Sequence, residues 1–321
     1  MSKKGYGYFE IRELADGVYA AIGDQDGLCH SNAGIIDLGD RTLVLDTLTL
    51  PSYGEALATA CRDLTGRGPS WIVLTHYHGD HWLGNQAFPL TTPILATPGM
   101  IPQLEQSMAQ YQGILDDPNG FAKELADYAS MTEAEENPEK RAGLQTNLAR
   151  YRALYDEITN LKLVGANTLF ESTLRLTGSK RSVELIEVRD NHTASDVYVK
   201  LPEDGVLFMG DLGFFDTIPF LGFADPIRWA ATLRDFETSE IQTYVPGHGA
   251  VAGVNKVTQQ RECIEAITDT VRSALAEGGE ITEALGERLP EPFRGWATGG
   301  RFNLMSYQRV AACLEETGEL G

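Results

Sequence analysis

Four side chains that can bind a metal ion lie within one stretch of six residues. They are His76, His78, Asp80 and His81. The stretch follows an apolar run at residues 71–74 that is typical of a β-strand. In extended backbone the first two imidazoles leave the chain on the same side and can bind one cation. A turn through Gly79 would direct the other two side chains toward a second cation. This mixture of imidazole and carboxylate groups predicts a metal site rather than a solvated surface turn.

Three later positions carry the same chemistry, each directly after a predicted strand. They are His192, Asp211 and His248. Because loops at one edge of stacked sheets can bring distant residues together, we expect these side chains to join the first group. Taken alone, either histidine would more often be an ordinary hydrogen-bonded side chain. Their combination with the first segment favours the metal site.

Short strands and one helix must position these residues. Apolar runs closed by Gly, Asp or Asn predict strands at 17–22, 33–37 and 42–46, and helical spacing of apolar residues predicts a helix at 53–64. Further strands are predicted at 168–170, 183–188, 196–201 and 205–210. The order is strand, helix, strand around the first ligands, and we expect the later strands to form a second sheet.

Helical patterns fill two other regions. Apolar residues recur at helical spacing in residues 100–161, which predicts a helical insertion, broken near the acidic stretch that contains Pro138. Asp225 and Pro226 have the residue types of a helix cap and a first helical position. Residues 255–321 are predicted to be mainly helical.

The overall charge argues against a nucleic-acid partner. The chain has 321 residues and a formal net charge of −20, from 46 acidic and 26 basic residues. Binding to a phosphate backbone needs clustered Lys and Arg, so we expect a small-molecule substrate. No apolar run has the length of a membrane span or of a signal-peptide core, so we expect no membrane association and a cytoplasmic location. A homodimer is left open.

Four motifs together closely resemble the metallo-β-lactamase superfamily. They are Thr75 to His81, Asn191 to Asp196, Leu207 to Leu212 and Pro246 to Gly249. Their order and approximate spacing are similar to the dinuclear members of the superfamily, such as glyoxalase II and lactonases. The resemblance implies an α/β fold, a four-layer αββα sandwich. In it, residues 1–321 form a single domain, 100–161 a helical insertion and 255–321 a C-terminal helical region.

The resemblance also implies a role for each candidate ligand. His76, His78 and His192 would hold the first metal, Asp80, His81 and His248 the second, and Asp211 would bridge the two. Asp46 matches an acidic residue that supports the ligand loops, since metal-bound imidazoles need an acceptor for their other N–H. Two zinc ions are the expected cofactors, with iron or manganese as alternatives, because all three accept imidazole and carboxylate.

The implied activity is hydrolysis of a small ester, thioester or lactone. A hydroxide that bridges the metals would be the nucleophile, and Asp80 could pass a proton to the leaving group. Asp211 stands where one large group of β-lactamases has cysteine, which disfavours that group, and His78 stands where the flavodiiron oxidoreductases have glutamate. The alternatives are a mononuclear iron enzyme like the persulfide dioxygenases, a sulfatase or phosphodiesterase on the same metal site, and a binding protein that retains the scaffold.

The substrate pocket is predicted from position alone. Phe214, Phe215 and Phe220 follow the bridging aspartate closely and are candidates for its wall. The insertion at 100–161 could fold over the same edge as a lid. Cys29 beside His30 is a further candidate pocket element, although an ordinary buried thiol is the favoured interpretation.

Overall fold

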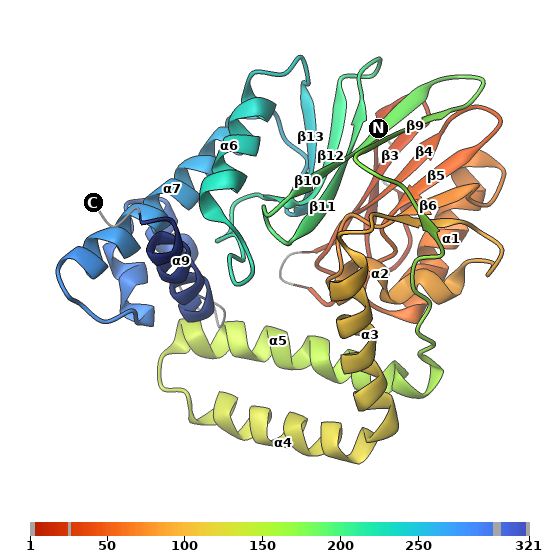
Figure 1. Cartoon of the computed structure of the whole chain (residues 1–321). Coiled ribbons are helices and arrows are strands. Elements are labelled where there is room, and N and C mark those ends of the chain that lie inside the picture. Colours follow the sequence, from red (N-terminus) through yellow and green to blue (C-terminus); the bar gives the residue numbers. More distant parts are fainter. Residues whose placement is uncertain (1–3, 25–26, 298–302, 319–321) are drawn as a thin grey trace.

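Two β-sheets stacked face to face form the centre of the molecule, and helices cover their outer sides (Figure 1). The computed structural model describes residues 4–24, 27–297 and 303–318. The first sheet has eight strands in sequence order, β1 to β8, and the second has five in the order β13-β12-β11-β10-β9. The predicted αββα sandwich is therefore confirmed.

The first sheet changes direction at its middle. Its strands are β1 Lys4–Gly5, β2 Glu10–Ala15, β3 Val18–Ile22, β4 Ala33–Asp37, β5 Thr42–Leu45, β6 Trp71–Val73, β7 Ile94–Ala96 and β8 Thr168–Leu169. Strands β1 to β5 pair antiparallel, and β5 to β8 pair parallel. The parallel arrangement brings the carboxyl ends of β5 and β6, which precede Asp46 and Thr75, to one edge of the sheet.

The second sheet carries the later candidate ligands. Its strands are β9 Thr173–Thr177, β10 Ser182–Arg189, β11 Ser195–Leu201, β12 Val206–Phe214 and β13 Thr243–His248. Neighbouring strands are antiparallel except β12 and β13, which are parallel. His192 lies in the β10–β11 connection, Asp211 lies within β12, and His248 ends β13.

The helices fall into three groups. The first comprises α1 Pro51–Thr65, α2 Gly79–Trp82 and the 3₁₀ helix η1 Leu83–Ala87. The second comprises α3 Ile101–Asp116, α4 Pro118–Ala134, α5 Pro138–Glu157 and η2 Ile158–Asn160. The third comprises α6 Pro226–Glu237, α7 Val254–Ala276, η3 Glu283–Arg288, α8 Phe293–Ala297 and α9 Asn303–Thr317. In Figure 1 the second group extends away from the sandwich, below the third group.

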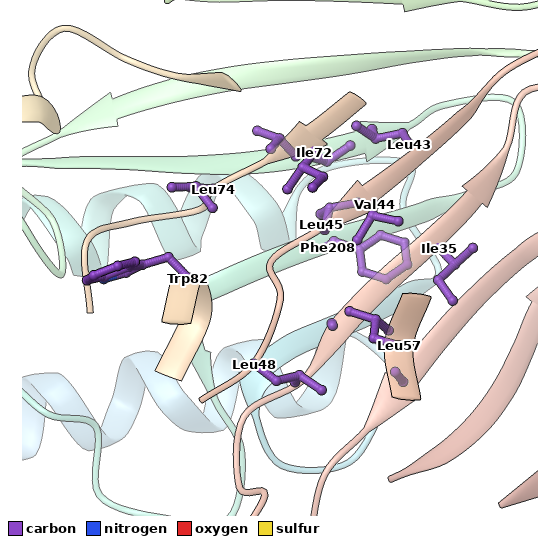
Figure 2. Close-up of a cluster of buried hydrophobic side chains, with 14 of the residues drawn as sticks. Ile35, Leu43, Val44, Leu45, Leu48, Leu57, Ile72, Leu74, Trp82 and Phe208 are labelled. Atoms are coloured by element: carbon purple, nitrogen blue, oxygen red, sulfur yellow. The ribbon is translucent and has the colours of Figure 1, made fainter. Parts of the chain in front are cut away.

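Apolar side chains from both sheets fill the space between them. Figure 2 shows Phe208 of β12 among Ile35, Val44 and Leu45 of the first sheet. A side chain at Gly34 would bring a Cβ atom to 2.8 Å from the Phe208 ring, so glycine at this position lets the sheets approach. The same cluster includes Leu43 of β5, Ile72 of β6 and Leu57 of α1.

A second apolar cluster lies on the outer face of the second sheet. Along β12, Val206 and Phe208 join the first cluster, whereas Leu207 and Met209 join the second. This alternation follows from the two-residue period of a strand with both faces buried. The outward side chains pack against α6, α7 and α9 through residues such as Trp229 and Ile264. Helices thus cover this sheet on one side, as the sandwich requires.

The predicted cap of α6 is confirmed. The side chain of Asp225 accepts hydrogen bonds from the backbone N–H groups of Ile227 and Arg228, and Pro226 is the first helical residue. These bonds satisfy donors that the first helical turn cannot satisfy by itself.

Two strand assignments differ from expectation. The segment at 168–170 was expected in the second sheet, but β8 pairs parallel with β7 and ends the first sheet. Asp211 was expected after a strand, but β12 continues through it to Phe214. The register of β12 against β13 shifts on either side of Gly210, which has φ 55°, so a bulge rather than a loop directs this aspartate.

Among the described residues, no helix is long and apolar enough to cross a membrane.

Candidate metal centre

Asp46 and Thr75 fix the backbone of the first ligand loop. The backbone N–H of Thr75 donates to Oδ1 of Asp46 at 2.8 Å, and its hydroxyl donates to Oδ2 at 2.7 Å. Asp46 is 2 % exposed and has φ 53°, a left-handed conformation in which Asp and Asn are enriched among residues with a side chain. Nδ1 of His81 lies 2.8 Å from the same Oδ2. One buried carboxylate therefore orients both ends of the segment from Thr75 to His81.

Three imidazoles converge to form the first group. Nε2 of His76 lies 2.9 Å from Nδ1 of His78, which lies 3.1 Å from Nε2 of His192. Oδ2 of Asp211 is 3.4 Å from Nε2 of both His76 and His192. The structure therefore brings together all four residues that were expected around the first metal, although they lie in the loop after β6, in the β10–β11 connection and within β12.

A second group adjoins the first through Asp211. Nε2 of His81 lies 3.2 Å from Oδ1 of Asp211, and Nε2 of His248 lies 3.3 Å from its Oδ2. Oδ2 of Asp80 is 3.4 Å from Nε2 of both histidines. The seven residues expected to bind metal thus lie together. The donor atoms of His76, His78, His192 and Asp211 form one group and those of His81, Asp211 and His248 a second, which Asp80 adjoins through both histidines.

In three of the imidazole rings a hydrogen bond is made by Nδ1, which leaves Nε2 available to bind a metal ion. Nδ1 of His81 donates to Asp46, because a carboxylate can only accept. In the same way Nδ1 of His192 donates to the carbonyl of Phe220, and Nδ1 of His248 to the carbonyl of His30, each at 3.1 Å. When these three rings are neutral, the proton is therefore on Nδ1 and the lone pair of Nε2 points into the cluster.

The spacing and chemistry of these atoms fit metal ions. Two ligands bound at about 2.1 Å to a tetrahedral cation lie about 3.4 Å apart, which matches the distances from Asp211 and Asp80 to the imidazoles. Nε2 of His81 and Oδ1 of Asp211 are buried without a hydrogen-bond partner. Unpartnered buried polar atoms are costly, and a cation between them would remove that cost. The residues present therefore fit the metals that the resemblance implied.

Burial and neighbouring charges set the pKa values of the residues in the first group. It lowers the pKa of His192 to about 3, and the pKa of His78 falls well below its usual value through burial and the neighbouring His76. Burial alone would raise the pKa of Asp211, but His248, His81 and His76 outweigh it and hold that pKa well below its usual value. Neutral imidazoles and an ionised carboxylate are the forms that bind metals.

Two glycines allow Asp211 to reach the centre. A Cβ atom on Gly247 would lie 1.9 Å from Oδ1 of Asp211, and one on Gly210 would lie 2.6 Å from Cβ of Thr75. Contacts this short are impossible, so β12 and β13 can approach the first ligand loop only with glycine at these positions.

The chain turns at Gly79 because α2 begins there, and not through a positive φ. A Cβ atom there would instead lie 2.1 Å from the hydroxyl of Tyr111, which belongs to α3. Glycine is required because a helix of the 100–161 region packs directly on the ligand loop. Sequence reasoning did not find Tyr111, since nothing in the local pattern distinguishes it from other apolar-face residues of α3.

His30 is a second residue that sequence reasoning did not assign to the site. It lies between β3 and β4, and its Nε2 is 3.5 Å from Oδ2 of Asp80. Its donor atom and those of Asp80 and His248 lie within 4.8 Å of one another. All six histidines of the sequence are therefore at this centre. The available signal was the absence of any other histidine in the chain.

The predicted pocket phenylalanines take different positions. Phe214 is 7 % exposed and stacks on His248 with ring centroids 4.8 Å apart. Phe215, at 2 % exposure, lies in the second apolar cluster. Phe220 and Phe223 face His78, with ring centroids 5.9 and 6.0 Å away. Phe223 is exposed, so it and Phe220 form the apolar border of the centre toward solvent.

A cavity of about 430 Å³ opens beside this border. It is lined by Gln103, Asp190, Ala194, Gly222, Phe223, Asp225, Arg228 and Arg309. The lining comes from α3, the loop around His192, and helices α6 and α9. Two arginines and two aspartates line it, and Arg228 pairs with both Asp190 and Asp225, at 3.6 and 3.4 Å.

A four-layer αββα sandwich with two adjoining His and Asp groups at one edge of its sheets defines a metal-dependent enzyme. A family model described as the Metallo-beta-lactamase superfamily matches residues 26–101 and 119–248, which is more than half of the chain. The chain belongs to the metallo-β-lactamase superfamily, whose members are metal-dependent hydrolases. Comparison with curated proteins gave no match.

Solved structures show the same fold at low sequence identity. The DIM-1 metallo-β-lactamase is 17% identical, with a TM-score of 0.54, and the match covers 80% of this chain and 97% of that one. The metallo-β-lactamase from Pontibacter korlensis is 14% identical, with a TM-score of 0.55, covering 80% and 99%. The sec-alkylsulfatase Pisa1 from Pseudomonas sp. is 18% identical, with a TM-score of 0.64, covering 94% of this chain and 49% of its own.

Proposed function

We propose that this protein is a dinuclear, zinc-dependent hydrolase of a small ester, thioester or lactone. One observation supports the proposal above all others. Two groups of imidazole and carboxylate atoms share Asp211, whose Oδ1 and Oδ2 face histidines of both groups at 3.2–3.4 Å. A carboxylate in this position can hold two cations close together.

The chain's own residues would divide the chemistry between them. Bound cations would supply Lewis acidity and make water acidic enough to be a nucleophile at neutral pH. His76, His78 and His192 would hold the first cation. Asp80, His81 and His248 would hold the second, since Oδ2 of Asp80 lies 3.4 Å from Nε2 of both histidines. Asp46 keeps His81 in the tautomer that can bind. Phe220 and Phe223 would exclude water from the face beside His78.

Asp80 is the residue best placed to handle a proton. Its side chain is 18% exposed, compared with 3% for Asp211, so it is the more accessible of the two carboxylates. Its Oδ2 already faces three imidazoles. We propose that Asp80 would bind the second cation and would transfer a proton from the attacking water to the leaving group.

A sulfate ester is the second candidate substrate. Arg228 pairs with Asp190 and Asp225 in the cavity lining, so Arg309 is the lining cation that could attract an anionic group there. The similarity to a sec-alkylsulfatase extends over 94% of this chain, although this chain covers only 49% of that protein. A sulfate ester carries a negative charge that an ester, thioester or lactone lacks. A substrate screen therefore distinguishes the two candidates.

Metal content tests the proposal first. Protein purified without added metal should contain about two zinc ions per chain by elemental mass spectrometry. Asp211→Ala should lose the second ion and most of the first, because both groups lose a ligand. Lactones, thioesters and sulfate esters should then be screened with wild-type protein and this variant.

Two other outcomes would contradict the proposed function. One iron per chain, with oxygen consumption in the presence of a thiol or persulfide, would replace the hydrolase with the dioxygenase alternative. Full zinc content and turnover in Asp211→Ala would contradict the proposed mechanism. We propose separately a cytoplasmic location, no nucleic-acid or membrane partner, and a homodimer. Fractionation and light scattering would test these proposals.

A further inference from the structure

His30 lies about as close to Asp80 as the two histidines expected at the second position do. Its Nε2 lies 3.5 Å from Oδ2 of Asp80, and the corresponding atoms of His81 and His248 lie 3.4 Å from the same oxygen. Three imidazole nitrogens thus surround one carboxylate oxygen at nearly equal distances. These distances match the separation of about 3.4 Å between ligands of one tetrahedral cation.

The backbone around His30 is bound to both loops that carry the second group. The hydroxyl of Ser31 donates to the carbonyl of Asp80 at 2.7 Å. The backbone N–H of Asn32 donates to the carbonyl of Gly247 at 2.8 Å, and the carbonyl of His30 accepts from Nδ1 of His248. The position of His30 relative to Asp80 and His248 is therefore determined by these hydrogen bonds and not by its side chain alone.

The competing interpretation is that His30 serves only to pack on His248. The two rings are stacked, with centroids 5.3 Å apart and an angle of 28° between planes. Packing alone would not require a nitrogen directed at Asp80, and a phenyl ring would pack as well. The side chain of His30 is 23% exposed, so it borders the accessible side of the second group.

We propose that His30 binds the second cation through Nε2, together with Asp80 and His248. This inference rests on the proposed dinuclear function. The donor atoms of His30, Asp80 and His248 lie within 4.8 Å of one another, as do those of His81, Asp211 and His248, so His30 would bind on the Asp80 side of the second position. The coordination position that His30 takes would not be open to water or substrate. An additional imidazole would also strengthen binding at the second position.

Binding of zinc alone tests this role without a substrate. His30→Phe keeps a flat ring to stack on His248 but removes the nitrogen. Leu28→Ala is the matched control, because Leu28 lies in the same loop and its side chain is 46% exposed. Metal-free proteins would be titrated with Zn²⁺ by equilibrium dialysis, with zinc measured by elemental mass spectrometry.

We expect His30→Phe to weaken the binding of one of the two zinc equivalents only. His30→Phe should bind the first equivalent of zinc as wild type does, and the second about 10- to 100-fold more weakly, by comparison with other losses around metal sites. Leu28→Ala should bind both as wild type does. Replacing zinc with Co²⁺ adds a spectroscopic readout. The visible bands of the second equivalent should gain intensity in His30→Phe, since lower coordination numbers absorb more strongly.

Each other outcome contradicts a defined part of the proposal. Unchanged affinities and cobalt bands in His30→Phe would overturn the role of His30 while leaving the dinuclear function intact. Fewer than two equivalents in wild-type protein would overturn the dinuclear function and this role with it. Circular dichroism in chelator checks that the variants fold. His30→Gln, which is smaller and polar, should reproduce the selective loss if His30→Phe is poorly folded.

Discussion

At the scale of single residues, the orientation of the ligands depends on Asp46. This carboxylate accepts hydrogen bonds from Thr75 and from Nδ1 of His81, and it does not itself belong to either group of converging atoms. Removing one acceptor should therefore weaken metal binding without removing a ligand.

Asp46→Asn should reduce the affinity for the second cation by about 10- to 100-fold. The amide nitrogen cannot accept the Nδ1 proton of His81, so the preferred tautomer and angle of that ring are lost. Asparagine also tolerates the left-handed φ of 53°, so the substitution adds little backbone strain. The affinities for both cations would be measured by zinc titration of the metal-free protein.

A second aspartate provides the control. Asp37 ends β4 at the opposite end of the sheet, where it pairs with Arg67 at 2.6 Å. Asp37→Asn should leave both zinc affinities unchanged. Equal losses in the two variants would show that the effect is a general loss of stability, and no loss in Asp46→Asn would contradict the orienting role.

The individual ligands could be predicted from sequence because their types and spacing are unusual. His76 and His78 stand two apart after a strand, and their nitrogens do converge at 2.9 Å. His30 could not be assigned in this way. It lies between two ordinary strands, and only the hydrogen bonds of Ser31 and Asn32 to distant loops bring it to the centre.

At the scale of elements, helix α3 packs directly against the ligand loop. Tyr111 packs against Trp82 of α2, with ring centroids 5.8 Å apart, and its hydroxyl occupies the space that a side chain at Gly79 would need. The position of α2, which carries Asp80 and His81, therefore depends on a residue that is far away in the sequence.

Gly79→Ala should destabilise the protein by about 1–3 kcal/mol, the usual cost of adding a group to a filled site. It should also weaken metal binding, because α2 must shift away from α3. Thermal unfolding and zinc titration measure the two effects. The double variant Gly79→Ala with Tyr111→Ala should recover metal affinity relative to Gly79→Ala, since the clashing ring is gone.

The single variant Tyr111→Ala completes a double-mutant cycle. If the effects of the two substitutions simply add, the contact between α3 and the ligand loop is not the reason for glycine at this position. Whether the helices at 100–161 act as a lid stays a prediction, and deleting them should change the catalytic constants once a substrate is known.

Element types could be predicted from sequence more easily than their partners. Periodicity indicated a helix near 53–64, and α1 spans Pro51–Thr65. The same reasoning assigned β8 to the wrong sheet, because two residues of extended chain have no pattern that identifies their neighbour. The bulge that directs Asp211 was also missed, since it arises where β12 pairs out of register with β13.

At the scale of the whole molecule, the metal centre joins the two halves of the sandwich. The segment from His76 to His81 follows a strand of the first sheet, whereas His192, Asp211 and His248 belong to the second. Direct hydrogen bonds also join the halves. The backbone N–H of Val197 donates to the carbonyl of Thr75 at 2.7 Å, and the side chain of Asn32 donates to the carbonyl of Pro246 at 2.8 Å. The sheets are therefore held together by their core and these bonds as well as by any cation.

Removing the metals should lower the melting temperature without unfolding the protein at room temperature. A ligand at a free concentration 1,000 times its Kd stabilises the folded state by about 4 kcal/mol, which for a chain of this size corresponds to a shift of roughly 6 °C. Chelator should thus lower Tm by about that amount, while the far-ultraviolet circular dichroism at 25 °C stays the same. Asp211→Ala should already melt near the chelated wild type and respond little to chelator, because it has lost the group that both sets share. A wild-type Tm that chelator leaves unchanged, in protein shown to have lost its metal, would contradict the idea that the centre links the two sheets.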